Sequence, residues 1–84
     1  MSLENKIYKH IQSILPQYDD LEYCNMYKLP ETINADIEYI FKLKTPLFKQ
    51  ELMNLEERLL KDIEEYCNLE NEPLPRIVFI FSEI

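Results

Sequence analysis

Glycine is absent from this chain of 84 residues. Average proteins contain about 7% glycine, which is the residue that takes positive φ angles at no steric cost. Its absence excludes glycine-rich phosphate loops, dinucleotide-binding fingerprints and glycine-flanked nucleophile elbows. Turns and helix ends must rely on Asn, Asp and Pro instead. The sequence therefore lacks the motifs by which several large enzyme classes bind nucleotides or activate a serine.

Histidine and cysteine are also scarce. His10 is the single histidine, and the only cysteines, Cys24 and Cys67, do not form a CxxC pair. A metal site needs several such ligands at short spacing, and a cysteine nucleophile needs a neighbouring base. We therefore expect no metal, no cofactor, no catalytic residue and no enzymatic activity. We interpret both cysteines as free, packed thiols of a reducing compartment, with a single disulfide as the alternative.

Long apolar runs are missing as well. The longest, Ile77–Phe81, has five residues, whereas about 20 are needed to cross a bilayer. The N-terminal residues MSLENKIYKHIQ have no apolar core of the kind found in signal peptides. With 46% apolar residues, the chain can still form one compact core. We expect one cytoplasmic domain, residues 1–84, without a membrane segment.

Positive charge is in deficit, with 9 basic against 16 acidic residues and a net charge of −7. This balance argues against binding to a phosphate backbone or an anionic membrane, where Lys and Arg provide the affinity. We expect neither direct nucleic-acid binding nor membrane binding. Residues 46–72 hold eight acids and three bases, a local charge of −5. Such a surface serves solubility or meets a basic protein partner.

Apolar spacing predicts four elements. Every third or fourth residue is apolar over 3–15 and again over 46–67, which is typical of amphipathic helices. Pro16 ends the first helix, Thr45-Pro46 begins the second, and Asn68 or Asn71 ends the second in the left-handed conformation. Residues 35–44 alternate between apolar and polar and predict a half-buried strand. Residues 76–82 predict a strand that is apolar on both faces.

Residues 17–34 allow two interpretations. Asp19 or Asp20 could cap a short helix that carries Leu21 and Cys24, or residues 22–29 could form a strand. The aromatic content favours the strand. The element order is then α-β-β-α-β. Because a strand–helix–strand unit prefers a right-handed crossover, we predict a two-layer α+β fold whose mixed three-stranded sheet is packed on one face by both helices.

Two groups of residues are candidates for partner contact. The outer face of the helix over 46–67 carries Glu56, Glu57, Lys61, Glu64 and Glu65. Tyrosine is enriched at interfaces, and Tyr18, Tyr23 and Tyr27 cluster in the ambiguous segment. We expect a non-enzymatic protein-binding module, such as an inhibitor, an antitoxin-like or immunity-like protein, or an adaptor. Its acidic helix face would bind a basic partner; the plainer interpretation of that face is a solvated surface.

The strand over 76–82 supports a second interpretation. An apolar strand with two apolar faces needs cover on both, and one helix layer covers only one of them. The other face, or the strand edge, is then available to a second copy of the chain. The alternative function is therefore a homodimer or a larger homo-oligomer.

The segments DIEYIFKLKTPLFKQELMNLEERLLKDI and PRIVFIF, within residues 36–81, resemble the strand–helix–strand part of KH-like domains, including a family of bacterial replicative-helicase loaders. The resemblance lies in the order of apolar positions. It implies an accessory domain of a nucleic-acid-processing complex. This chain departs from the KH pattern because it has neither the GxxG loop nor a basic stripe.

Overall fold

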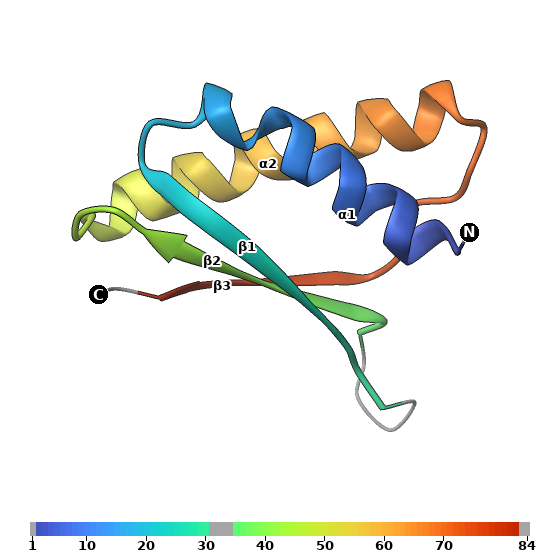
Figure 1. Ribbon diagram of the computed structural model, residues 1–84, viewed down its shortest axis with the longest axis horizontal. Coiled ribbons are helices and arrows are strands. Elements are labelled where there is room, and N and C mark those ends of the chain that lie inside the picture. The colour runs from blue at the N-terminus through green and yellow to red at the C-terminus, as the bar shows by residue number, and fades with distance from the viewer. Residues whose placement is uncertain (1, 31–34, 83–84) are drawn as a thin grey trace.

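The computed structural model describes residues 2–30 and 35–82. Three strands form one sheet in the order β1-β2-β3, with β1 antiparallel and β3 parallel to β2. Both helices lie on the same face of this sheet (Figure 1). The predicted α+β order and the mixed sheet are confirmed. The elements are α1 (Leu3–Ile14), the 3-10 turn η1 (Leu15–Gln17), β1 (Leu21–Lys28), β2 (Ile37–Leu43), α2 (Lys49–Leu69) and β3 (Ile77–Ser82).

Helix α1 begins and ends as its sequence indicates. The Ser2 hydroxyl accepts a hydrogen bond from the Asn5 N–H at 3.3 Å and so caps the first turn. Ile7, Ile11 and Ile14 form its buried stripe. Proline at position 16 lacks an N–H and falls in the first turn of η1, so the chain tightens into a 3-10 turn there.

The ambiguous segment forms the strand β1, and the alternative of a short helix is wrong. Leu21 and Cys24 point into the core, while Tyr23 and Tyr27 point away from it. An irregularity between Leu21 and Tyr23 shifts the register with β2 by one residue. This shift is why two buried residues can be separated by two exposed ones. Tyr23 and Tyr27 therefore lie on one face of the strand.

Helix α2 begins later than predicted. Its first residue is Lys49, and Thr45-Pro46 lies in the preceding loop. The Phe48 N–H donates to the Glu51 carboxylate at 3.1 Å, which satisfies a backbone donor at the new start. At the other end, Asn71 has φ = 56° and Glu72 N–H donates to Cys67 O at 2.8 Å. The left-handed asparagine that replaces glycine at this helix end is confirmed.

The core lies between the helices and the sheet, and β2 is its centre. Ile37, Tyr39, Phe41 and Leu43 are each at most 1% exposed, so the predicted inward face of this strand is confirmed. Tyr39 keeps its polar tip satisfied, because its hydroxyl donates to Glu4 O at 3.3 Å. On the helix side the buried stripe of α2 is Leu55, Leu59, Ile63 and Cys67.

Truncating this stripe should lower stability strongly. Leu59 is fully buried, so Leu59→Ala should lower the free energy of unfolding by about 2–5 kcal/mol. Leu69 on the same helix is 86% exposed, and Leu69→Ala should change the free energy of unfolding by less than about 0.5 kcal/mol. Urea denaturation followed by circular dichroism measures both. Equal effects would contradict the packing of α2 through this stripe. If Leu59→Ala does not fold, Ile63→Val replaces it in this test, with an expected loss in free energy of unfolding of about 0.5–1.5 kcal/mol.

Candidate protein-interaction surfaces

The acidic face of α2, defined as Glu56, Glu57, Lys61, Glu64 and Glu65, is exposed at all five positions. It points outward because Leu55, Leu59 and Ile63 hold the opposite side of the helix against the sheet. Lys6–Glu72 and Asp36–Arg76 are the ion pairs between described residues, and neither involves this face. The structure places Glu57, Lys61, Glu64 and Glu65 on neighbouring positions of the outer helix surface. Glu56 lies to the side of them, next to Met53 and Leu60.

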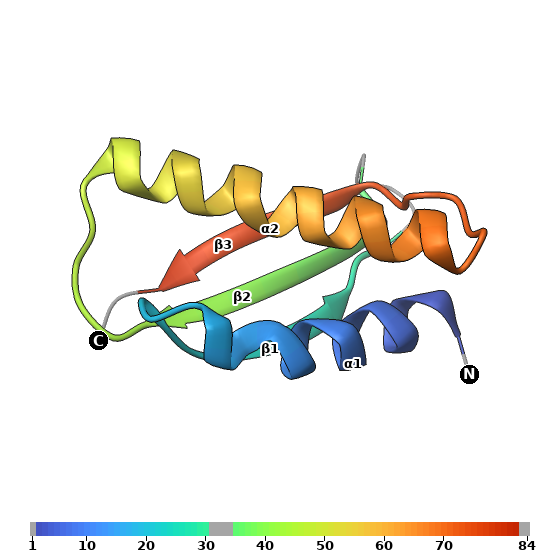
Figure 2. The ribbon, with the colours of Figure 1, turned by 90° about the horizontal axis from the view of Figure 1, so that it is seen from above.

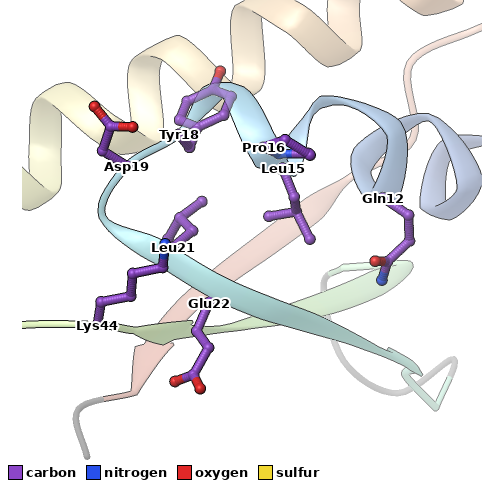
Figure 3. Close-up of a pocket in the computed structure, with 8 residues that line it drawn as sticks. All are labelled: Gln12, Leu15, Pro16, Tyr18, Asp19, Leu21, Glu22 and Lys44. Carbon is purple, nitrogen blue, oxygen red and sulfur yellow. The ribbon is translucent and has the colours of Figure 1, made fainter.

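Tyr18 does not belong to an exposed surface, contrary to expectation. It is 3% exposed, because η1 turns the chain and directs its ring toward α2 (Figure 3). Its hydroxyl donates to the Asp62 carboxylate, and the Arg58 guanidinium lies 4.7 Å from the ring centroid. Burial, followed by the hydrogen bond to Asp62, raises the pKa of Tyr18 well above its usual range. Tyr18 therefore connects η1 to α2 inside the molecule.

Tyr23 and Tyr27 are exposed, at 47% and 52%. They pair with the outward residues Lys42 and Glu38 of β2, whereas α2 lies on the opposite face of the sheet (Figure 1). One flat partner cannot contact both groups at once. The predicted contact residues therefore divide between two separate surfaces.

The second surface is the face of the sheet opposite the helices, which we call the open sheet face. Its residues were not grouped from the sequence. Its central row runs across all three strands through Asn25, Ile40 and Ile80. Two signals in the sequence pointed to it: Ile40 is the one apolar residue on the polar side of β2, and β3 is apolar on both sides. The cross-strand register that joins these positions follows from the fold.

An ion pair that the sequence did not reveal joins the starts of β2 and β3. The Arg76 guanidinium donates to Asp36 Oδ1 at 3.1 Å, and the Arg76 N–H donates to Oδ2 at 3.0 Å. These hydrogen bonds lower the pKa of Asp36. The two residues are 40 positions apart, so no local pattern could have indicated the pair. It lies where β2 and β3 begin side by side.

Both cysteines are free and buried. Burial raises the pKa of the Cys24 thiol to about 12 and also raises that of Cys67. Thiols with such pKa values are protonated at neutral pH and react slowly. The interpretation of Cys24 and Cys67 as packed thiols is confirmed.

A hollow of about 320 Å³ lies between η1, β1 and the end of β2 (Figure 3). Leu15 and Leu21 face each other within it, and Asp19, Glu22 and Lys44 supply charged groups. Nowhere in residues 2–30 and 35–82 do three or more His, Cys, Asp or Glu side chains come together as metal ligands. The described helices also include none that is both long and apolar enough to span a bilayer.

Comparison of the chain with protein-family models, with curated proteins and with solved structures found no match. The strand–helix–strand unit β2–α2–β3 is present as the KH-like resemblance implies. The nucleic-acid-related role that it implies stays an expectation.

The contact between Tyr18 and Asp62 generates a prediction about stability and pH. Tyr18→Phe removes one hydrogen bond to a carboxylate, so it should lower the free energy of unfolding at pH 7 by about 1 kcal/mol. The folded-state pKa of Tyr18 lies above its unfolded value of 10.0. The contribution is therefore complete below pH 10 and is lost as the pH rises further. Urea denaturation at pH 7 and near pH 11 should show the difference between wild type and variant shrinking.

Tyr27→Phe is the matched control for that substitution. Tyr27 is 52% exposed, so the loss of its hydroxyl should leave the free energy of unfolding within about 0.5 kcal/mol of wild type at both pH values. An identical effect of the two substitutions would refute the structural role of Tyr18.

Proposed function

We propose that this protein is a small, non-enzymatic protein-binding module and that the acidic face of α2 binds a basic surface of its protein partner. The observation that carries the proposal is the gathering of four exposed carboxylates and one amine on a single helix of 21 residues. An inhibitor, an antitoxin-like protein and an adaptor would all use such a face in the same way.

The helix that carries these carboxylates is held on two sides. Its buried stripe packs on the sheet. On the flank toward α1, Asp62 accepts a hydrogen bond from Tyr18, and the Tyr66 ring stacks on His10 with 4.4 Å between centroids. A backbone that is already ordered loses little conformational entropy on binding. This support favours α2 as a preformed binding element.

The spacing of the charges also suits recognition of a basic surface. Glu57, Lys61 and Glu64 are four and three residues apart and so share one ridge of the helix. Glu57 and Glu64 stand roughly 10 Å apart along the axis. Each carboxylate can accept two hydrogen bonds from an arginine, and the ridge as a whole attracts a basic partner over distance. Lys61 between them weakens that attraction.

Charge changes on this ridge should move affinity in opposite directions. The double substitution Glu57→Lys with Glu64→Lys should weaken capture of a basic protein from a lysate of the producing cells by roughly tenfold or more. Lys61→Glu should strengthen it, because it replaces a positive charge on this ridge with a negative one. Mass spectrometry identifies the captured protein, and titration of that purified protein at two salt concentrations gives the affinities. Binding should fall as salt rises.

Asp19→Lys with Glu22→Lys is the control, since both residues are exposed and neither belongs to α2. It changes the net charge by the same amount and should leave the affinity within about twofold of wild type. A loss equal to that of the α2 variant would show that net charge alone governs binding. No response to any of the three variants would remove the proposal.

A further inference from the structure

The open sheet face is the largest feature that the proposed function leaves unused. Tyr23, Tyr27, Val78 and Ile80 on this face are 37–52% exposed. They make up half of the exposed large apolar residues in the described part of the chain. No helix or strand of the described residues covers them (Figure 1). Such a concentration of exposed apolar side chains marks an interaction surface.

Cross-strand pairing arranges this face in three rows. The central row is Asn25, Ile40 and Ile80. On one side of it, Tyr27, Glu38 and Val78 lie opposite one another. On the other side, Tyr23 lies opposite Lys42. Each flanking row thus has a tyrosine on β1 and one charged residue on β2.

The charges of β2 on the open sheet face cancel. Glu38 and Lys42 stand on either side of Ile40 on the same strand, roughly 13 Å apart. The two charges that β2 contributes to this face therefore balance, although the chain carries a net charge of −7. Two copies that meet through this face keep their acidic α2 helices on the outside, on opposite sides of the assembly. Their mutual repulsion is then small.

We propose that the open sheet face is a homodimer interface, in which a second copy of the chain packs face to face with Glu38 of each copy against Lys42 of the other. The two-fold axis runs across the strands, along the central row. Ile40 and Ile80 then meet their own counterparts, and Tyr23 lies over Tyr27 of the second copy. Aromatic pairs of this kind add to the stabilisation that burial provides.

The charge pattern selects this arrangement over the other symmetric one. Aligned sheets pack with their strands within about 30° of each other, so a two-fold axis in the interface runs either nearly across or nearly along the strands. An axis along the strands would place Glu38 on Glu38 and Lys42 on Lys42 of the second copy. Only the axis across the strands joins opposite charges, and it does so twice. Lys42 already takes part in an interaction within the chain, and an ammonium with three donors can bind a further carboxylate.

The size of the face indicates a reversible dimer. Three strands at about 4.8 Å spacing and six residues at about 3.3 Å rise cover roughly 14 × 20 Å. Two such faces amount to roughly 560 Å² of flat area, which is below the ~1,200 Å² at which standard specific interfaces begin and corresponds to a weak, transient contact. We expect a dissociation constant on the order of a hundred micromolar.

Sedimentation equilibrium from about 5 µM to about 1 mM, a range that brackets the expected dissociation constant, tests the proposal. Wild type should change from monomer to dimer within it. Glu38→Lys alone, and Lys42→Glu alone, should each weaken dimerisation roughly tenfold or more, because symmetry creates two like-charge contacts from one substitution. The chain that carries both substitutions should dimerise as wild type does. An equimolar mixture of the two single variants should form a heterodimer.

Circular dichroism shows whether each variant is folded, and the double substitution guards against a trivial loss of structure. A wild type that stays monomeric at 1 mM would overturn the proposal, and so would a double variant as weak as the single ones. Pairing through the outer edge of β3 would leave the single variants at wild-type strength, since β2 is the central strand, and would overturn it too. The dimer does not depend on the function proposed above, since the two surfaces are separate. Glu57→Lys with Glu64→Lys should therefore leave dimerisation unchanged.

Discussion

The structure depends on one strand, β2, which is buried on its inner face and hydrogen-bonded along both edges. It pairs antiparallel with β1 and parallel with β3, and it contributes Ile37, Tyr39, Phe41 and Leu43 to the core. A shift of one residue in its register would turn all four side chains to the solvent. Every surface described above takes its position from this strand. The sheet carries α2 on one side, and the outward residues of β2 carry the charges on the other.

The alternation within β2 was strong enough to be identified from the sequence, and so were the stripes of α1 and α2. The start of α2 was not predicted correctly. Thr45-Pro46 has the residue types of a helix start, but Glu51 caps the backbone at Phe48, and α2 begins after it. The carboxylate of Glu51, three residues after Phe48, caps the helix, and the hydroxyl of Thr45 does not. Asn71 was predictable because a chain without glycine has few other residues that accept a positive φ.

The candidate contact residues show where sequence reasoning ends. Helical periodicity places Glu57, Lys61 and Glu64 on one ridge of α2, with Glu65 beside it and Glu56 to its other side. The three tyrosines were grouped by their closeness in sequence, and tertiary structure separated them. A 3-10 turn after Pro16 directs Tyr18 inward, whereas the strand leaves Tyr23 and Tyr27 outside. The pairing of Asn25, Ile40 and Ile80 in one row depends on the registers of β1 and β3 against β2, and local patterns do not fix those registers.

The two proposed interfaces differ in the balance of their charges. On the open sheet face, opposite charges flank an isoleucine on one strand, so the surface complements itself after a two-fold rotation. On α2, four carboxylates outnumber one lysine, so the surface repels its own copy and suits the basic partner that we propose. The two uses are therefore compatible in one assembly. A dimer formed through the sheets would display two acidic helices on opposite sides, and a partner with two basic sites of matching separation would bind it with higher effective affinity than a single helix provides.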